Sequence, residues 1–208
     1  MDVKRVVGYR QFCNKLWNVT KFALMNFPEG FQPEKKGING LELSLLDKWI
    51  INRLSEVVKT TNICFEKYDF GPMAQNIYDF WLKELADYYI EALKPVMKGT
   101  DEEAKKAALN TLYLCLDHGL KLLHPTMPYL TEELYQRLPH RKGEAFESIC
   151  IATFPTEVTS FGNQKVEENF NDLKDMVSRF RSLIAALNIK NNQNPNIFIK
   201  CTSDATFK

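Results

Sequence analysis

The sequence has 208 residues, of which 45% are hydrophobic and 25% charged, and its formal net charge is +1. This length and composition indicate a globular chain of one or two domains with a sizeable core. The near-zero net charge excludes nucleic-acid binding through overall charge, so any such binding needs a local cationic patch. No stretch approaches the roughly 20 apolar residues that span a membrane. The charged residues directly after Met1 argue against a signal peptide.

The cysteines and histidines exclude several kinds of site. The five cysteines are an odd number, spread along the chain without a Cys-x-x-Cys pair, which favours reduced thiols over a disulfide framework or a zinc site. His118, His124 and His140 also lack the spacing of metal ligands. We therefore expect a cytoplasmic protein without a metal site in this chain.

Residues 3–27 predict a long first helix, because they contain no proline and their apolar residues recur at helical spacing. The expected core-facing stripe is Val6, Tyr9, Cys13, Trp17, Thr20, Leu24 and Phe27. A second stripe is polar and basic and ends in an aromatic residue: Lys4, Gly8, Gln11, Lys15, Asn18 and Phe22. Cations, an amide and a ring suit the phosphates, base edges and base faces of single-stranded nucleic acid. A solvated face, with the phenylalanine under a neighbouring loop, is the alternative interpretation.

Four more helices are predicted before residue 139. A loop at 29–40 precedes a helix that Ser44 caps, with Asp47 completing a near capping box, and that runs to about Tyr68. The next helices are expected at 72–97 and, with acidic residues 101–103 in its first turn, up to His124. A short helix that Thr131 caps ends at Leu138.

The rest of the chain has a different character. Residues 140–162 have loop composition around a β-rich run at 148–153. A long helix at 166–187 follows, with a narrow apolar seam of period about 3.5, and residues 196–202 alternate as a strand. The predicted fold is all-α, a bundle of about five helices followed by the start of a small α/β appendage. The expected division is a bundle at 1–139, then a connector, a long helix and a strand of a truncated appendage at 140–208.

Two stretches resemble one enzyme family. Residues 13–24 (CNKLWNVTKFAL), with Arg10-Gln11-Phe12 before them, resemble the opening helix of the anticodon-binding domain of valyl-tRNA synthetases of the eukaryotic cytoplasmic type. Residues 124–134 (HPTMPYLTEEL) resemble the end of this domain across the class I synthetases for large aliphatic amino acids. The resemblance covers most of residues 10–138 and implies that the chain is a fragment of a valine–tRNA ligase.

The resemblance also implies where tRNA binds. Residues 81–91 resemble the third-helix signature of the valyl family, in which the positions of Ile90 and Glu91 face the anticodon. On the first helix, Lys15, Asn18, Lys21 and Phe22 match the family's anticodon contacts. Weaker candidates for the tRNA backbone are Lys4, Arg5, Arg10 and Gln11. Without the resemblance, Ile90 reads as core and Glu91 as a solvated residue.

No catalytic site is expected within this chain. It has no Gly-rich phosphate loop, and the two ATP motifs of the family are missing, so ATP and magnesium belong to a catalytic domain elsewhere in the parent enzyme. The expected partners are tRNA(Val) and the remainder of the synthetase, with no DNA and no membrane. Alternatives are the same module of an isoleucyl enzyme, a helical protein-interaction or oligomerisation domain using the 166–187 seam, and a small enzyme with a reactive cysteine.

Overall fold

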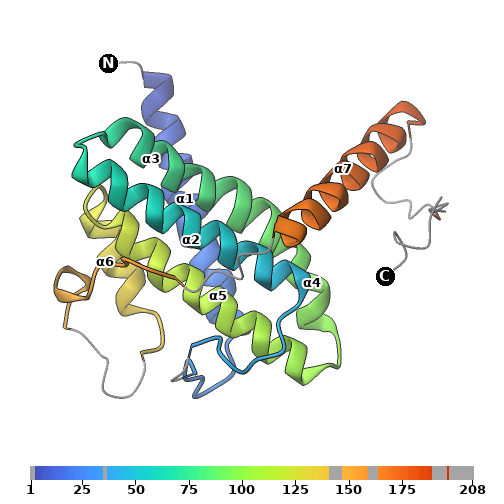
Figure 1. The fold of residues 1–208 in the computed structure, drawn as a ribbon, viewed down its shortest axis with the longest axis horizontal. Helices are drawn as coiled ribbons and strands as arrows, with labels where there is room; N and C mark the ends of the chain where they lie inside the picture. Colours follow the sequence, from blue (N-terminus) through green and yellow to red (C-terminus); the bar gives the residue numbers. More distant parts are fainter. Residues whose placement is uncertain (1–2, 35–36, 141–146, 159–163, 189–195, 197–208) are drawn as a thin grey trace. The chain divides into compact units, whose positions relative to one another are not determined.

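The computed structural model describes residues 3–34, 37–140, 147–158, 164–188 and 196 (Figure 1). The side chains of residues 3–6 and 164 are outside this description. The described residues form helices and the loops between them and contain no strand, which confirms the all-α prediction. The chain divides into two compact units, Met1–Glu167 and Glu168–Lys208. The predicted domain division at residue 139 stays a prediction.

The first helix, α1 (Val3–Asn26), ends within one residue of the prediction, but its core-facing side was predicted wrongly. The buried residues are Phe12, Leu16, Val19, Thr20 and Ala23. Tyr9 and Trp17, both expected in the core, are 64% and 39% exposed. At about 100° per residue, the buried stripe lies roughly 70° around the helix from the predicted one, and only Thr20 belongs to both. The physical reason is that α1 contacts η1 (Phe80–Ile90), α5 (Glu102–Leu123) and α6 (Pro128–Gln136), so apolar residues line its flanks as well as its buried side.

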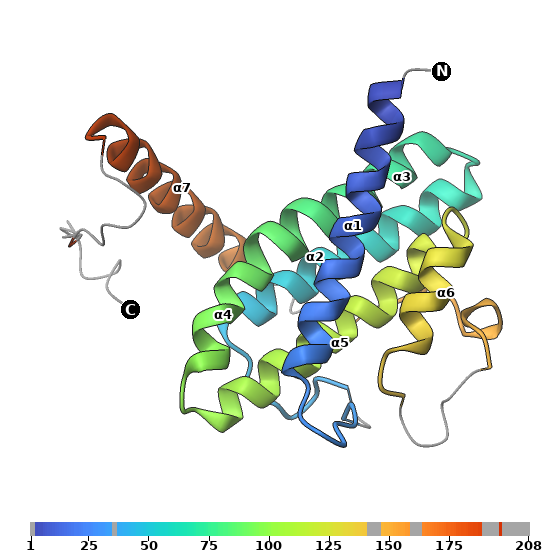
Figure 2. The same ribbon diagram turned by 180° about the vertical axis from the view of Figure 1, so that it is seen from behind.

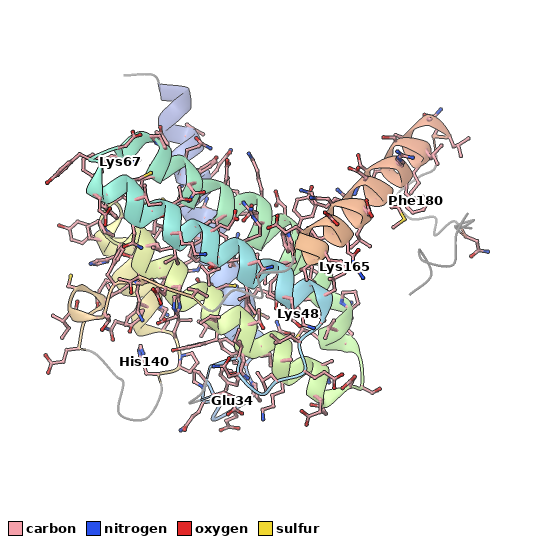
Figure 3. All side chains as sticks on the ribbon, viewed as in Figure 1. Glu34, Lys48, Lys67, His140, Lys165 and Phe180 are labelled. Carbon is pink, nitrogen blue, oxygen red and sulfur yellow. The ribbon has the colours of Figure 1, made fainter. Side chains whose placement is uncertain are left out.

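The second helix, α2 (Leu45–Glu66), begins at the predicted cap and ends two residues before the predicted end. The Asp47 amide donates to Ser44 Oγ over 3.1 Å, and the Ser44 amide donates to Asp47 Oδ2 over 3.0 Å. This reciprocal pair satisfies two amide groups that would otherwise lack partners at the helix start. The preceding loop is held on α5, where Glu34 (labelled in Figure 3) pairs with Lys106 over 2.8 Å.

The helix predicted at 72–97 is one continuous helical segment of three parts. These are α3 (Phe70–Asp79), the π-helical η1 (Phe80–Ile90) and α4 (Glu91–Lys98). Trp81 and Tyr89 of η1 are fully buried. π-helical turns are uncommon and occur frequently at functional sites, and η1 lies beside α1.

The next helix, α5 (Glu102–Leu123), crosses the centre of the first unit, and most of its residues are buried. Asp101, predicted inside its first turn, instead caps it by accepting from the Ala104 amide over 3.0 Å. Gly119 lies against the indole of Trp81, whose Nε1 donates to the Gly119 carbonyl over 3.4 Å. A Cβ at position 119 would lie 2.9 Å from the Trp81 ring, so this close packing requires glycine.

One local prediction between α5 and the last helix is wrong. The short helix α6 (Pro128–Gln136) begins at Pro128, and Thr131, the predicted cap, lies buried inside it. A proline at the first helical position needs no amide partner, which explains the earlier start. The β-rich run at 148–153 contains the 3₁₀ turn η2 (Ile149–Ile151), because Ser148 and the Ile149 amide bind Glu132 of α6.

The last helix, α7 (Gln164–Ala186), confirms the predicted long helix at 166–187 to within two residues at its start and one at its end. Of the strand predicted at 196–202, the structure describes only Asn196, so the appendage lies almost wholly outside the described residues. Among the described residues, no helix has the length and apolar character to cross a membrane. The expected cytoplasmic location stays a prediction.

Candidate nucleic-acid interface

The polar stripe on α1 lies beside η1. Lys15 Nζ lies 3.0 Å from Asp87 Oδ1 on η1, and both side chains are partly exposed. Gln11, Asn18 and Phe22 share this side of α1 with Lys15, since they are three or four residues apart. We call these four residues the Lys15 stripe. Figure 2 shows α1 crossing this side of the first unit, with α4 on one side and α6 on the other.

The four residues of the Lys15 stripe differ in exposure. Gln11 and Asn18 are exposed, whereas Lys15 and Phe22 are half-buried. Phe22 was expected to be more solvent-exposed than Trp17, and the structure reverses this order. The stripe lies at the edge of the packed side of α1, so its larger side chains are partly covered by neighbouring elements. It still offers a cation, two amides and the accessible part of a ring in one row.

Other predicted residues of α1 lie outside this stripe. Arg10 and Lys21 are exposed, and the helical repeat places Lys21 about 120° from Lys15. Lys21 can therefore meet a phosphate that passes over α1, but it does not point the same way as the stripe. Lys4 and Arg5 belong to the first turn of α1, and their side chains lie outside the described residues.

Of the two residues predicted on the third helix, Ile90 lies in the core and Glu91 lies at the surface. Ile90 is only 6% exposed, so its side chain packs in the core and is not available as an apolar surface for RNA. Glu91 is exposed, and its Oε1 lies 2.6 Å from Lys94 Nζ. Ile90 can therefore act only by fixing the position of Glu91, the next residue.

Two residues beside the predicted site, Asp87 and Arg137, were not predicted from the sequence. Asp87 lies within the quoted third-helix signature, but only the fold shows that it reaches Lys15. On the opposite flank of α1, the Arg137 guanidinium of α6 lies 5.3 Å from the centre of the Trp17 ring. A cation over an indole face is an attractive contact. The exposure of Trp17 therefore places an aromatic–cation pair beside the solvent-facing side of α1.

The arrangement combines donors and acceptors for a single-stranded loop. Lys15, Lys21 and Arg10 can meet phosphates, and Asn18 and Gln11 can form hydrogen bonds with base edges. Asp87 and Glu91 are acceptors, which suit the amino groups of bases and repel phosphate. The Lys15 cation beside two carboxylates can thus orient an RNA strand, with its backbone toward α1 and its bases toward η1 and α4. Among the described residues, no three His, Cys, Asp or Glu side chains group as metal ligands.

Comparisons with known proteins show which family this chain resembles. A family profile described as the anticodon-binding domain of tRNA ligase matches residues 47–199. The chain is 44% identical over 207 residues to human valine–tRNA ligase, which covers 99% of this chain. It is 38% identical over 209 residues to the mitochondrial valine–tRNA ligase of Saccharomyces cerevisiae, covering 100% of the chain. It is 37% identical over 202 residues to the valine–tRNA ligase of Clostridium perfringens, covering 97% of the chain.

These matches cover nearly all of this chain but only a small part of each relative. The chain spans 16% of the human protein, 19% of the yeast protein and 22% of the bacterial protein. It therefore corresponds to one part of much longer enzymes. The family profile matches more than half of the chain, from the first turn of α2 onward and including α5 and α6. The chain thus belongs to the family of anticodon-binding domains of tRNA ligases.

Proposed function

We propose that this chain is the anticodon-binding part of a valine–tRNA ligase and that it binds tRNA(Val). The observation that carries the proposal is the similarity to valine–tRNA ligases of a mammal, a yeast and a bacterium, which extends over nearly the whole chain, α1 included. The complete enzyme would join valine to tRNA. ATP and magnesium would act in a catalytic domain outside these residues, because the chain contains neither of the ATP motifs expected of the family.

In this proposal the anticodon loop lies over the Lys15 stripe and the start of α4. Lys15 exchanges its contact with Asp87 for an RNA phosphate, and Lys21 and Arg10 meet phosphates farther along the strand. Asn18 binds a base edge, and the accessible face of Phe22 stacks on a base. Glu91 accepts from a base amino group once it leaves Lys94. Lys4, Arg5 and Gln11 remain weaker candidates for backbone contacts.

A salt-dependent affinity follows from this geometry. Exposed ion pairs such as Lys15–Asp87 and Glu91–Lys94 contribute only about 0–1 kcal/mol each. RNA can therefore replace them at low cost. Because few cations meet the strand, binding of the isolated chain should be weak and fall steeply with salt.

The direct test measures the affinity of the chain for anticodon stem-loops by fluorescence anisotropy at fixed salt. A valine stem-loop is compared with one that differs only in carrying an isoleucine anticodon. We expect the valine stem-loop to bind at least about tenfold more tightly, which corresponds to about 1.4 kcal/mol. Equal affinities, or preference for the isoleucine anticodon, would contradict the assignment to valine.

The oligomerisation alternative makes a different prediction. Leu173, Val177 and Leu187 of the 166–187 seam are exposed in the described structure. If this seam joined two copies of the chain, sedimentation velocity at micromolar concentration would show a dimer, and Leu173→Glu would dissociate it. A monomer at that concentration, together with specific stem-loop binding, favours the tRNA-binding function.

A further inference from the structure

Cys150 and His124 form a thiol–imidazole pair at the surface. His124 Nε2 lies 3.0 Å from Cys150 Sγ, and Cys150 is exposed. The two residues are 26 positions apart, one directly after α5 and the other in η2, so the fold alone brings them together. A nucleophile within hydrogen-bond distance of a base is the first requirement of an activated thiol.

A third residue sets the tautomer of the imidazole. Thr131 Oγ1 donates to the Met127 carbonyl over 2.9 Å, and Oγ1 lies 2.7 Å from His124 Nδ1. A hydroxyl that has donated its proton accepts from Nδ1–H, which leaves Nε2 of the neutral ring as an acceptor. Nε2 therefore accepts from the Cys150 thiol. Thr131 is fully buried, so this orientation is held by the core of α6.

The segment that carries Cys150 is fixed on α6 by a second set of contacts. Glu132 Oε2 accepts from Ser148 Oγ over 2.7 Å and from the Ile149 amide over 3.0 Å. Burial tends to raise the pKa of Glu132, but these hydrogen bonds and one from Gln136 hold that pKa below its ordinary value. The Glu132 carboxylate thus stays charged near His124. The carboxylate also interacts electrostatically with His124.

We propose that Cys150 is a reactive thiol that undergoes exchange with low-molecular-weight disulfides, with His124 as its base and Thr131 as the residue that positions the base. Nε2 takes the thiol proton, and the Cys150 sulfur attacks one sulfur of the disulfide RS–SR. The new Cys150–SR bond forms as the RS–SR bond breaks, and the released thiolate takes the proton from His124. The product is a mixed disulfide at Cys150 and one free thiol RSH, with no net oxidation or reduction.

The other described cysteines lack this environment. Cys64 and Cys115 are buried, and Cys13 is half-buried. Burial raises the pKa of Cys115, and the charge of Asp47 raises it further, which disfavours its thiolate. Cys13 is therefore the internal reference for a partly accessible thiol for which the described structure shows no imidazole partner.

The experiment treats the 208-residue chain with oxidised glutathione, quenches it with an alkylating reagent at timed intervals, and measures each cysteine by peptide mass spectrometry. We expect Cys150 to react at least about tenfold faster than Cys13, because it is exposed and His124 Nε2 is placed to take its proton as the sulfur attacks. His124→Asn should lower the reaction rate of Cys150 at least about tenfold, while the matched control His118→Asn should change that rate by less than about twofold. In urea, where the fold is lost, the rates of Cys150 and Cys13 should converge.

The comparison of Cys150 with Cys13 uses the unsubstituted chain, so it holds even if His124→Asn fails to fold. Circular dichroism establishes which variants are folded. Equal rates for the two cysteines in the folded chain would overturn the proposal. So would an unchanged Cys150 rate in folded His124→Asn.

Discussion

Lys15 of α1 and Asp87 of η1 form an ion pair with 3.0 Å between Nζ and Oδ1. The two side chains are 43% and 57% exposed, so water screens their attraction and the pair contributes little to stability. It does place a cation and a carboxylate side by side where α1 meets the third-helix signature. In the proposed complex, a phosphate would take the place beside Lys15 that the Asp87 carboxylate occupies in the unbound chain.

Removing Lys15 should therefore change how tRNA binding depends on salt. Replacing Lys15 with Ala removes one phosphate contact and should make the slope of log K against log salt shallower by about 0.7–0.9. The measurement is a titration of the valine stem-loop at several salt concentrations. The control is Lys59→Ala, an exposed lysine on α2, which should leave the slope unchanged. Equal slopes for the original chain and Lys15→Ala would remove Lys15 from the interface.

Phe22 should contribute to both folding and binding. Because its ring is half-buried, Phe22→Ala should lower the free energy of unfolding by about 1–3 kcal/mol, less than a fully buried phenylalanine. The loss of base stacking should weaken stem-loop binding by about 1–3 kcal/mol per folded molecule. Urea unfolding and anisotropy separate the two effects.

A half-buried phenylalanine elsewhere supplies the matched control for Phe22. Phe65 of α2 packs against Phe70 and Phe154. Phe65→Ala should cost comparable stability without changing the affinity of the folded molecules. If Phe22→Ala and Phe65→Ala had the same effect on affinity, Phe22 would be a packing residue only.

The elements that follow from neighbouring residues could be predicted from the sequence. The Ser44–Asp47 capping box is local, since its two residues are three apart and need no other part of the fold. The length of α1 follows equally from its periodicity and from Pro28. Which side of α1 is buried does not follow from the sequence. Trp17 and Tyr9 are apolar enough for the core, yet Trp17 lies on a flank of the helix and Tyr9 lies on an exposed turn.

Contacts between distant residues could not be predicted in the same way. Thr131 has the composition of a helix cap, but Pro128 starts α6 earlier and Thr131 binds His124 instead. No cluster of Lys, Arg and His surrounds a cysteine in the sequence, so the sequence does not point to a reactive thiol, yet the fold places His124 beside Cys150. For the candidate tRNA site, the types of residue could be predicted from the sequence. The contact of Asp87 with Lys15 and the burial of Ile90 are visible only in the structure.

The contact between Gly119 and Trp81 predicts that position 119 does not tolerate a side chain. Gly119→Ala would place a methyl group 2.9 Å from a buried indole and should lower the free energy of unfolding by about 1–3 kcal/mol. Gly8→Ala is the control, because a Cβ there meets no atom within 4 Å; on an exposed helix it should raise stability by about 0.5–1 kcal/mol. Urea denaturation measures both. A neutral Gly119→Ala would mean that the Trp81 ring moves freely, contrary to its tight packing.

The buried Asp47 makes Tyr89 important for stability. Tyr89 Oη donates to Asp47 Oδ1 over 2.6 Å, and burial together with the Asp47 charge raises the pKa of Tyr89, so it stays protonated as a donor. Tyr89→Phe would leave a buried carboxylate oxygen without this donor and should cost about 1.5–3 kcal/mol. Tyr129→Phe, at an exposed tyrosine, should have almost no effect. Similar unfolding midpoints for the two variants would argue against the buried hydrogen bond.

The central proposal is that RNA lies on α1, η1 and α4, and amide chemical-shift mapping tests it most directly. The isotope-labelled chain is titrated with the valine anticodon stem-loop at low salt. The proposed interface predicts that the largest shifts lie at residues 10–22 and 87–94, with little change in the turn between α2 and α3. Shifts concentrated in that turn or on α7, with residues 10–22 unchanged, would contradict it.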